Sequence, residues 1–138
     1  MDPIAVVKDP VAVVRAYEVT WDTTNAADMP SYFAEGGTYT PSGEAPLAGQ
    51  AIADYAATVF RAFPDSRMPI TKIFADGDDV CVVWEYSATM TGDFGPFKAT
   101  GKSFRLTGCH VIQVEDGKLR SVISRWDRLD MMQQLGLV

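Results

Sequence analysis

Apolar residues recur at intervals of three and four in the first half of the chain and at every second position in the second half. The first pattern predicts one helix that begins at Asp9-Pro10 and another that follows Gly49, because such spacing places apolar side chains on one helical face. Asp9 supplies an N-cap acceptor, and Pro10 suits the first position of a helix. A shorter helix is predicted over residues 29–34, and Pro64 ends the helix after Gly49.

Alternating apolar and polar residues predict strands in the second half of the chain. The predicted strands cover a short stretch around Tyr39 and residues 68–75, 80–90, 102–114 and 119–126, followed by a helix over residues 128–135. Helices come first and strands last, which favours an α+β fold over alternating βαβ units. We therefore predict a single domain over residues 1–138. In it a curved antiparallel sheet wraps around about three helices and forms a cone with an internal pocket.

Composition and charge narrow the class of partner. The chain has 138 residues and a formal net charge of −6, without a run rich in Lys and Arg. Nucleic acids and anionic membranes are bound mainly through clustered cations, so neither is an expected partner. The N-terminal stretch lacks the pattern of a secretory signal. Cys81 and Cys109 are therefore expected to be free thiols in a cytoplasmic protein.

His110 is the only histidine in the chain. The alternation of its strand places it on the same face as Leu106, Ile112 and Val114, which is the side predicted to face the pocket. An imidazole titrates near neutral pH and can both take up and release a proton. A lone histidine on an apolar face is also a common core residue, and the spacing leaves both interpretations open.

Two polar residues near the last strand are further candidates. Asp127 could be a catalytic acid in the cavity, but its place at the start of a helix is also a standard capping position. Ser124 shares strand parity with Trp126 and is interpreted as a polar lining residue. No G-x-S-x-G sequence surrounds Ser124, so a serine nucleophile is not expected.

Aromatic residues are numerous for a chain of this length, and some of them should line the pocket rather than fill the core. Flat apolar walls with a few hydroxyl groups suit a planar or polycyclic small molecule. The candidate substrate-binding residues are Tyr17, Trp21, Tyr39, Phe60, Trp84, Tyr86, Phe104, Ser124 and Trp126. No metal-ligand spacing, phosphate-binding loop or dinucleotide fingerprint is present, so we expect neither a metal nor another cofactor.

Five segments, in order, carry a family resemblance: FPDSR, DGDDVCVVWEYSATMTGDF, ATGKSF, VEDGKL and WDRLDMMQQLG. Together they resemble the SnoaL-like polyketide cyclases over roughly residues 11–136. That family belongs to a cone-shaped superfamily that includes nuclear transport factor two, ketosteroid isomerase and scytalone dehydratase. The resemblance implies an enzyme without a cofactor, a site inside the cone and a homodimer.

The resemblance also implies roles for particular residues. In the cyclases, a histidine before the DGK hairpin and an aspartate after it flank the substrate, and the aspartate takes the proton that generates the enolate. His110 occupies the position of the family histidine. Ser124, however, stands twelve residues before Gly136, where family members usually have an acid, while Asp127 matches a second family aspartate nine residues before that glycine.

Three functions therefore remain possible from the sequence. The first is acid–base cyclisation or isomerisation of a hydrophobic small molecule, such as a polyketide-like compound, with His110 and Asp127 as catalytic residues. The second is altered chemistry, such as hydroxylation or epoxide opening, in which the shape of the pocket directs a reactive substrate. The third is a binding or dimerisation module that does not catalyse a reaction, since the fold alone does not separate these functions.

Overall fold

The computed structural model describes residues 9–138, so the N-terminal stretch lies almost entirely outside the described residues. Helices are α2 (Pro10–Asp22), η1 (Met29–Tyr32, a 3₁₀ turn), α3 (Gln50–Ala62) and α4 (Arg128–Gln134). Strands are β1 (Phe33–Thr40), β2 (Leu47–Ala48), β3 (Ile70–Asp76), β4 (Asp79–Thr89), β5 (Ser103–Glu115) and β6 (Lys118–Arg125). They form one six-stranded sheet in the order β2-β1-β6-β5-β4-β3. This architecture confirms the predicted α+β cone.

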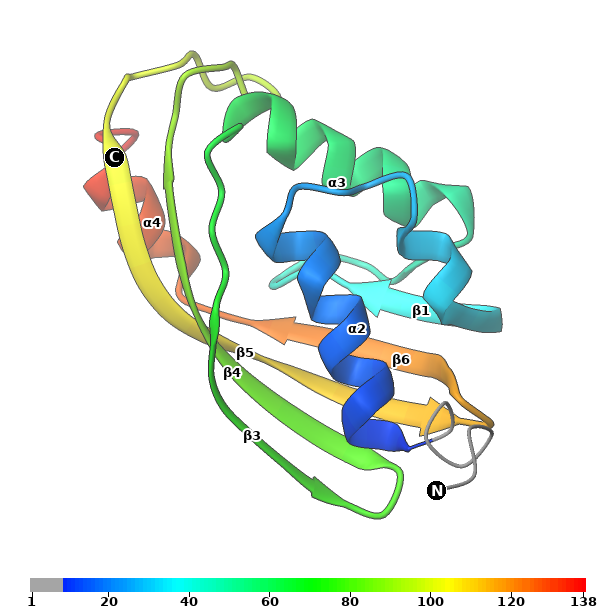
Figure 1. The fold of residues 1–138 in the computed structure, drawn as a ribbon. Coiled ribbons are helices and arrows are strands. Elements are labelled where there is room, and N and C mark those ends of the chain that lie inside the picture. The colour runs from blue at the N-terminus through cyan, green and yellow to red at the C-terminus, as the bar shows by residue number, and fades with distance from the viewer. Residues whose placement is uncertain (1–8) are drawn as a thin grey trace.

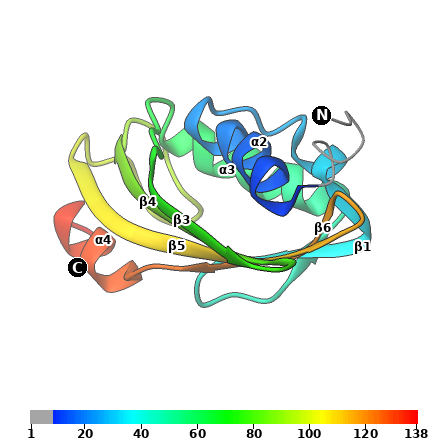
Figure 2. The same cartoon turned by 60° about the horizontal axis from the view of Figure 1, so that its bottom comes forward.

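The sheet curves strongly, and α2 and α3 cover its concave face (Figure 1 and Figure 2). The α2 helix begins as predicted, because the side chain of Asp9 accepts a hydrogen bond from the Val11 amide and Pro10 occupies its first turn. On the side of α2 that faces the sheet, Tyr17 and Trp21 are buried. These two aromatic side chains bring the C-terminal half of α2 onto the middle strands.

The alternation of β4 and β5 determines which side chains enter the cone. Every second residue of these strands is buried, as the sequence pattern predicts. The register pairs Trp84 of β4 with Gly108 of β5. A Cβ atom at residue 108 would collide with the Trp84 ring, so the glycine makes room for this indole. His110 follows two residues later on the same inner face and is completely buried.

The opposite face of the sheet is more accessible. Val111 and Phe74 point outward and are 47% and 54% exposed. Cys81 and Cys109 also lie on these strands as free thiols, as predicted. The homodimer implied by the family resemblance stays a prediction.

The C-terminal segment closes one end of the cone (Figure 1). Strand β6 ends at Arg125, and the Asp127 side chain accepts a hydrogen bond from the Asp130 amide at 3.0 Å, which caps α4. Gly136 has a φ of +74°, a conformation that glycine adopts without strain where the helix has ended. Helix α4 thereby lies against β5, next to the region where the sheet bends most.

Three details differ from the sequence-based expectations. The predicted helix over residues 29–34 is a single 3₁₀ turn, because the chain becomes extended at Phe33 and enters β1. Strand β3 starts at Ile70 rather than residue 68, since the Met68 amide donates to the Asp22 carboxylate at 2.7 Å. Strands β1 and β6 pair in parallel, so the otherwise antiparallel sheet is mixed.

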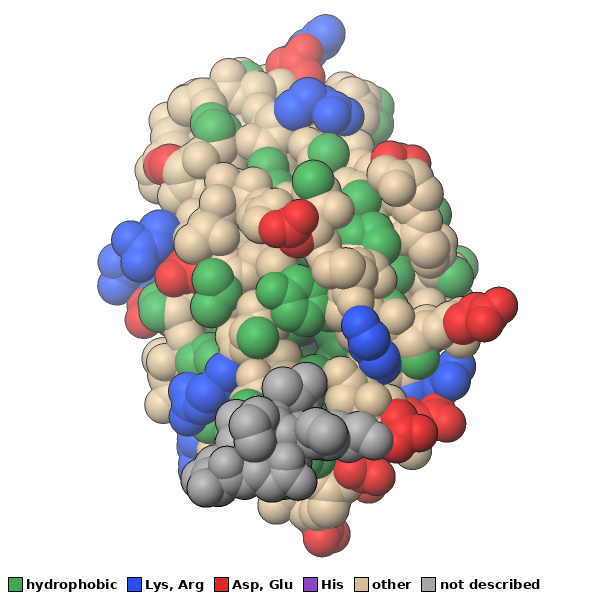
Figure 3. All heavy atoms as spheres, turned by 45° about the vertical axis from the view of Figure 1, so that its right-hand side comes forward, with side chains coloured by type: hydrophobic (Ala, Val, Ile, Leu, Met, Phe, Trp, Pro, Cys, Tyr) green, Lys and Arg blue, Asp and Glu red, His purple; other side chains and the backbone are tan. Residues whose placement is uncertain are grey.

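The surface shows no extended basic area on the face in Figure 3, where cationic and anionic side chains are interspersed around the edge. No helix within residues 9–138 has the length and apolar character needed to cross a membrane.

Candidate functional site

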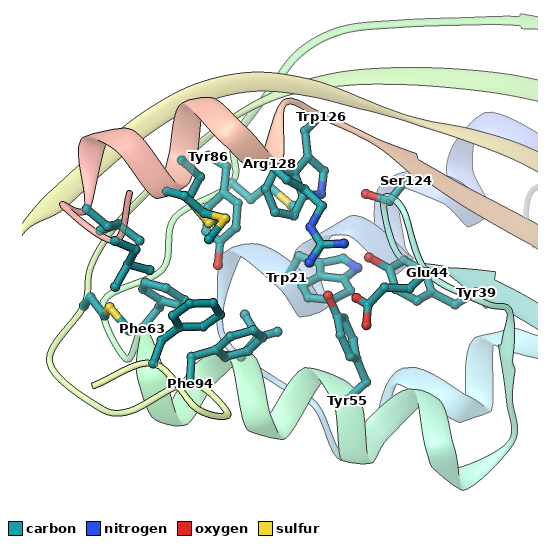
Figure 4. Close-up of a pocket in the computed structure, with 18 residues that line it drawn as sticks. Trp21, Tyr39, Glu44, Tyr55, Phe63, Tyr86, Phe94, Ser124, Trp126 and Arg128 are labelled. Atoms are coloured by element: carbon teal, nitrogen blue, oxygen red, sulfur yellow. The ribbon is translucent and has the colours of Figure 1, made fainter. Parts of the chain in front are cut away.

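A cavity lies inside the cone (Figure 4). Its wall is formed by the inner face of the sheet, by α3 and α4, and by the loop over residues 91–101. This loop contains three glycines, Gly92, Gly95 and Gly101. The lining residues are Trp21, Tyr39, Glu44, Tyr55, Val59, Phe63, Met68, Tyr86, Met90, Phe94, Phe97, Ser124, Trp126, Arg128, Met131, Met132, Leu135 and Leu137.

Most of the wall is aromatic or thioether. Such a lining offers flat contact surfaces together with methionines that adapt to an irregular ligand. Of the nine candidate substrate-binding residues, the structure places Trp21, Tyr39, Tyr86, Ser124 and Trp126 in the wall. The other four pack in the hydrophobic core behind it: Tyr17, Phe60, Trp84 and Phe104. Strand parity alone does not separate the two sets, because wall and core residues share the inner face.

His110 lies behind the cavity wall and is not among the lining residues. Its Nδ1 atom is 2.6 Å from Oε1 of Glu18, and both side chains are almost completely buried. The rings of Trp21 and Tyr39, which do line the cavity, lie 6.2 and 6.0 Å from the imidazole centroid. Trp84 lies closer, at 5.2 Å. Aromatic rings therefore separate the acid–histidine pair from the cavity.

Some polar atoms in and around the Glu18–His110 pair lack a hydrogen-bond partner. Within the described residues, Nε2 of His110, Oε2 of Glu18 and the indole nitrogen of Trp84 have no hydrogen-bond partner. Buried polar atoms normally have one, and those that lack one often mark a functional position. With Nδ1 engaged by the carboxylate, Nε2 is the imidazole atom left free to exchange a proton.

Sequence reasoning missed Glu18. A signal was nevertheless present, because Glu18 falls four residues after Val14 and three before Trp21, on the buried stripe of α2. An acid on an apolar helical stripe requires a partner, since burying an unpaired carboxylate is costly. The partner comes from β5, 92 residues away, and the helical pattern does not identify it.

Tyr39 and Ser124 form a small polar area on the cavity wall. Ser124 of β6 pairs with His110 of β5 across the two strands. Burial raises the pKa of Tyr39 well above its usual value, and the hydrogen bond with Ser124 opposes this shift only in part. The Tyr39 phenol is therefore a neutral hydroxyl at physiological pH. The two hydroxyl groups can donate hydrogen bonds to a ligand oxygen (Figure 4).

Glu44 and Arg128 provide the charged groups of the wall, and both are exposed at its rim. Arg128 donates a hydrogen bond from Nη1 to the Ser42 carbonyl oxygen at 3.3 Å. Both charges act on Tyr55: after burial, which raises its pKa most, Glu44 raises the pKa further and Arg128 lowers it. Sequence reasoning missed this rim because Glu44 lies in a loop and Arg128 in a short helix, where periodicity carries little information.

Asp127 is exposed and lies outside the set of lining residues. Its Oδ1 atom is occupied by the Asp130 amide. The structure therefore favours the capping interpretation that the sequence left open, and a catalytic role for Asp127 stays a prediction. Among residues 9–138 no group of three or more potential metal ligands is assembled.

Comparison with known proteins agrees with this architecture. The family model for SnoaL-like polyketide cyclases matches residues 11–135. No curated protein matches the sequence significantly. A solved structure of a candidate polyketide cyclase from Acidithiobacillus ferrooxidans is 27% identical and has a TM-score of 0.74, over 99% of both chains.

Two further solved structures share the fold at lower identity. The candidate hydroxylase AclR from Streptomyces galilaeus is 17% identical, with a TM-score of 0.81 over 94% of this chain and 82% of AclR. IdmH from Streptomyces antibioticus, a candidate polyketide cyclase, is 18% identical, with a TM-score of 0.80 over 93% of this chain and 99% of IdmH. The family match covers nearly the whole described chain, and the chain therefore belongs to the SnoaL-like polyketide cyclase family.

Proposed function

We propose that this protein is an enzyme that needs no cofactor and acts on a hydrophobic, polycyclic or polyketide-like molecule inside the cone. The reaction is an acid–base cyclisation or isomerisation. One observation carries the proposal: a buried carboxylate–histidine pair with a free Nε2 lies behind the cavity wall, and His110 pairs across neighbouring strands with Ser124, which lines the cavity. An apolar cavity next to a proton acceptor is suited to generating an enolate from a ketone.

The proposed roles follow from the positions of the groups. A substrate carbonyl oxygen accepts a hydrogen bond from the Tyr39 hydroxyl, which stabilises the negative charge that develops on it. The C–H bond next to that carbonyl breaks, its proton passes to the Ser124 hydroxyl oxygen while the Ser124 O–H proton passes to Nε2 of His110, and its electron pair forms the enolate. Glu18 holds the imidazole by Nδ1 throughout. The enolate carbon then attacks a second carbonyl of the same molecule, or takes up a proton at another position.

Opposed residues on neighbouring antiparallel strands have Cβ atoms about 4.5–5.5 Å apart. The Ser124 hydroxyl is therefore the cavity group best placed to pass a proton between substrate and imidazole. This route also accounts for a serine at the position where relatives have an acid. The proton acceptor is then His110 on the neighbouring strand β5, and Ser124 of β6 connects it to the cavity.

Proton abstraction can be measured with surrogate ketones, without knowing the natural substrate. Polycyclic ketones are incubated with the protein in D₂O, and deuterium incorporation next to the carbonyl is followed by mass spectrometry. We expect exchange with the unaltered protein and a decrease of about 10²–10⁴-fold with His110→Gln, the usual contribution of a positioned acid–base group. Ser124→Ala, at the cavity wall, should also slow exchange.

Arg125→Gln on the exposed end of β6 is the matched control and should leave exchange unchanged. Circular dichroism and thermal melting establish that each variant is folded. Equal exchange rates for His110→Gln and the unaltered protein would exclude the imidazole as the proton acceptor.

A second candidate is a small-molecule-binding protein without catalysis. It is favoured by the complete burial of His110 and its absence from the cavity wall. This candidate predicts that ligands copurify or bind tightly, that no deuterium is incorporated, and that substitutions at Tyr86 or Trp126 weaken binding while His110→Gln does not.

A further inference from the structure

Among residues 9–138, Arg128 is the one cation in the lining of the cavity, and its guanidinium group points toward Trp21 and Tyr55 (Figure 4). It has no ion pair with any carboxylate among residues 9–138, in contrast to the paired arginines of the outer surface. A guanidinium has five N–H donors, and a single hydrogen bond to the Ser42 carbonyl leaves the others available.

The backbone around Ser42 holds this guanidinium in place. The Ser42 hydroxyl donates to the Trp126 carbonyl oxygen at 3.0 Å and accepts from the Trp126 amide at 3.3 Å, which ties the loop to the end of β6. Gly43 lies against the arginine, and a Cβ atom there would be 3.0 Å from Nη1. Arg128 is therefore supported by a buried serine and by a glycine that leaves room for it, rather than extending freely into solvent.

Glu44 lies on the same rim, one residue beyond this support, and both Glu44 and Arg128 act electrostatically on the Tyr55 phenol. The two charges do not form an ion pair. Solvent screens both exposed charges, so Glu44 opposes an anion in the cavity only weakly, and Arg128 differs from it in offering N–H donors as well as charge.

From this arrangement we propose that Arg128 binds a planar pair of oxygen acceptors on the hydrophobic substrate, either a carboxylate or an enolised dicarbonyl group. The inference rests on the proposed function in taking the cavity as the substrate site, and it adds the polar end of the substrate. The forked guanidinium matches two coplanar oxygens in a way that a lysine ammonium does not. The substrate is thereby oriented, with its acidic or dicarbonyl end at the rim and its reacting carbonyl at Tyr39 and Ser124.

The test compares two probes of the same shape, 2-naphthoate and 2-naphthamide. Binding is measured by quenching of tryptophan fluorescence, since Trp21 and Trp126 both line the cavity. We expect the unaltered protein to bind the carboxylate at least tenfold more tightly than the amide. Arg128→Met should weaken naphthoate binding about 10- to 100-fold, the range for a hydrogen-bonded ion pair, and change naphthamide binding little.

Three further variants sharpen the result. Arg128→Lys should recover only part of the preference for the carboxylate. Glu44→Gln should tighten naphthoate binding, because it removes the opposing charge. Arg105→Met, at an exposed arginine paired with Glu85 outside the cavity, is the control and should have no effect. If Arg128→Met leaves naphthoate affinity unchanged, or weakens both probes equally, the proposed role of Arg128 is wrong.

Failure of this inference is distinguishable from failure of the proposed function. His110→Gln should decrease deuterium exchange about 10²–10⁴-fold and leave the preference for naphthoate over naphthamide intact, while Arg128→Met should remove that preference. If the unaltered protein exchanges deuterium but does not prefer naphthoate over naphthamide, the role of Arg128 alone is overturned. Absence of exchange with selectivity preserved would overturn the acid–base proposal alone.

Discussion

Two pairs of a carboxylate and a basic side chain lie around one cavity and differ in almost every physical respect. Glu18 and His110 are completely buried behind the wall and are joined at 2.6 Å. Glu44 and Arg128 are exposed at the rim, line the cavity and do not form an ion pair. The two pairs differ because one is shielded from water and the other is not. A buried charged or polar group needs a protein partner for its hydrogen bonds, whereas water provides those hydrogen bonds to an exposed group.

The comparison suggests that the two pairs have different functions. The buried pair has one fixed geometry, which suits a group that must exchange a proton at a defined position. The rim residues have N–H donors and carboxylate oxygens that are not used by each other, which suits recognition of a ligand. Each of the following substitutions tests whether the two pairs differ as their burial implies.

Removing the acid of the buried pair should have the largest effect. Glu18→Ala leaves the His110 ring without its partner in an apolar surrounding, and we expect the free energy of unfolding to fall by about 3–5 kcal/mol. Glu44→Ala, which removes the same chemical group from the rim, should change it by less than about 0.5 kcal/mol. Urea denaturation measures both variants, and similar losses would contradict the comparison.

Replacing the glycine beside each pair with alanine should also affect stability differently at the two places. Gly108→Ala places a methyl group against the Trp84 ring and 2.8 Å from the Arg125 carbonyl oxygen, so it should cost about 1–3 kcal/mol of unfolding free energy. Gly43→Ala meets the movable end of Arg128 and requires a positive φ, for which we expect about 1 kcal/mol. Thermal melting at matched protein concentration compares them. A smaller loss at Gly108 would show that the core around the buried pair is loosely packed.

Alkaline titration tests whether solvent reaches the Tyr39 phenol in the cavity wall next to His110. Burial raises the pKa of Tyr39 well above 10, so its phenol stays protonated in the folded state at a pH where the unfolded chain has lost the proton. Stability is therefore fully present below about pH 10 and falls as the pH rises further, by about 1.4 kcal/mol per pH unit for each such group.

Tyr39→Phe should make this decline correspondingly shallower in denaturation curves recorded between pH 9 and 11. An unchanged slope would mean that solvent reaches the phenol in the folded protein. Phenolate absorbance at high pH provides an independent readout of the same ionisation.

The smallest effect is expected at the helix cap. Asp127→Ala removes the acceptor for the Asp130 amide and should reduce the free energy of unfolding by about 1 kcal/mol, a typical cost of losing an N-cap. Asp127→Ser keeps a capping oxygen and should restore most of the stability. If exchange activity falls with both variants while the fold is retained, Asp127 has the catalytic role that the sequence allowed.

Much of the fold could be predicted because capping residues and apolar periodicity within short segments determine its helices and strands. The start of α2 at Asp9-Pro10, the alternation along β4 and β5, and the cap at Asp127 are all encoded within a few residues. The parallel pairing of β1 with β6 joins segments about 80 residues apart and leaves no local trace. The same limit explains why His110 was predicted on the inner face and its partner Glu18 was not.

The sequence by itself determined the α+β class, the inward faces of the strands and the family, since periodicity and short motifs encode all of these. Only the tertiary structure decided which inward residues reach the cavity. It places Trp84 and His110 behind the wall and Ser124 in it, although all three share the inner face of the sheet. The reason is physical: the depth of a side chain depends on the curvature of the sheet and on the helices that cover it, and neither is a property of a single segment.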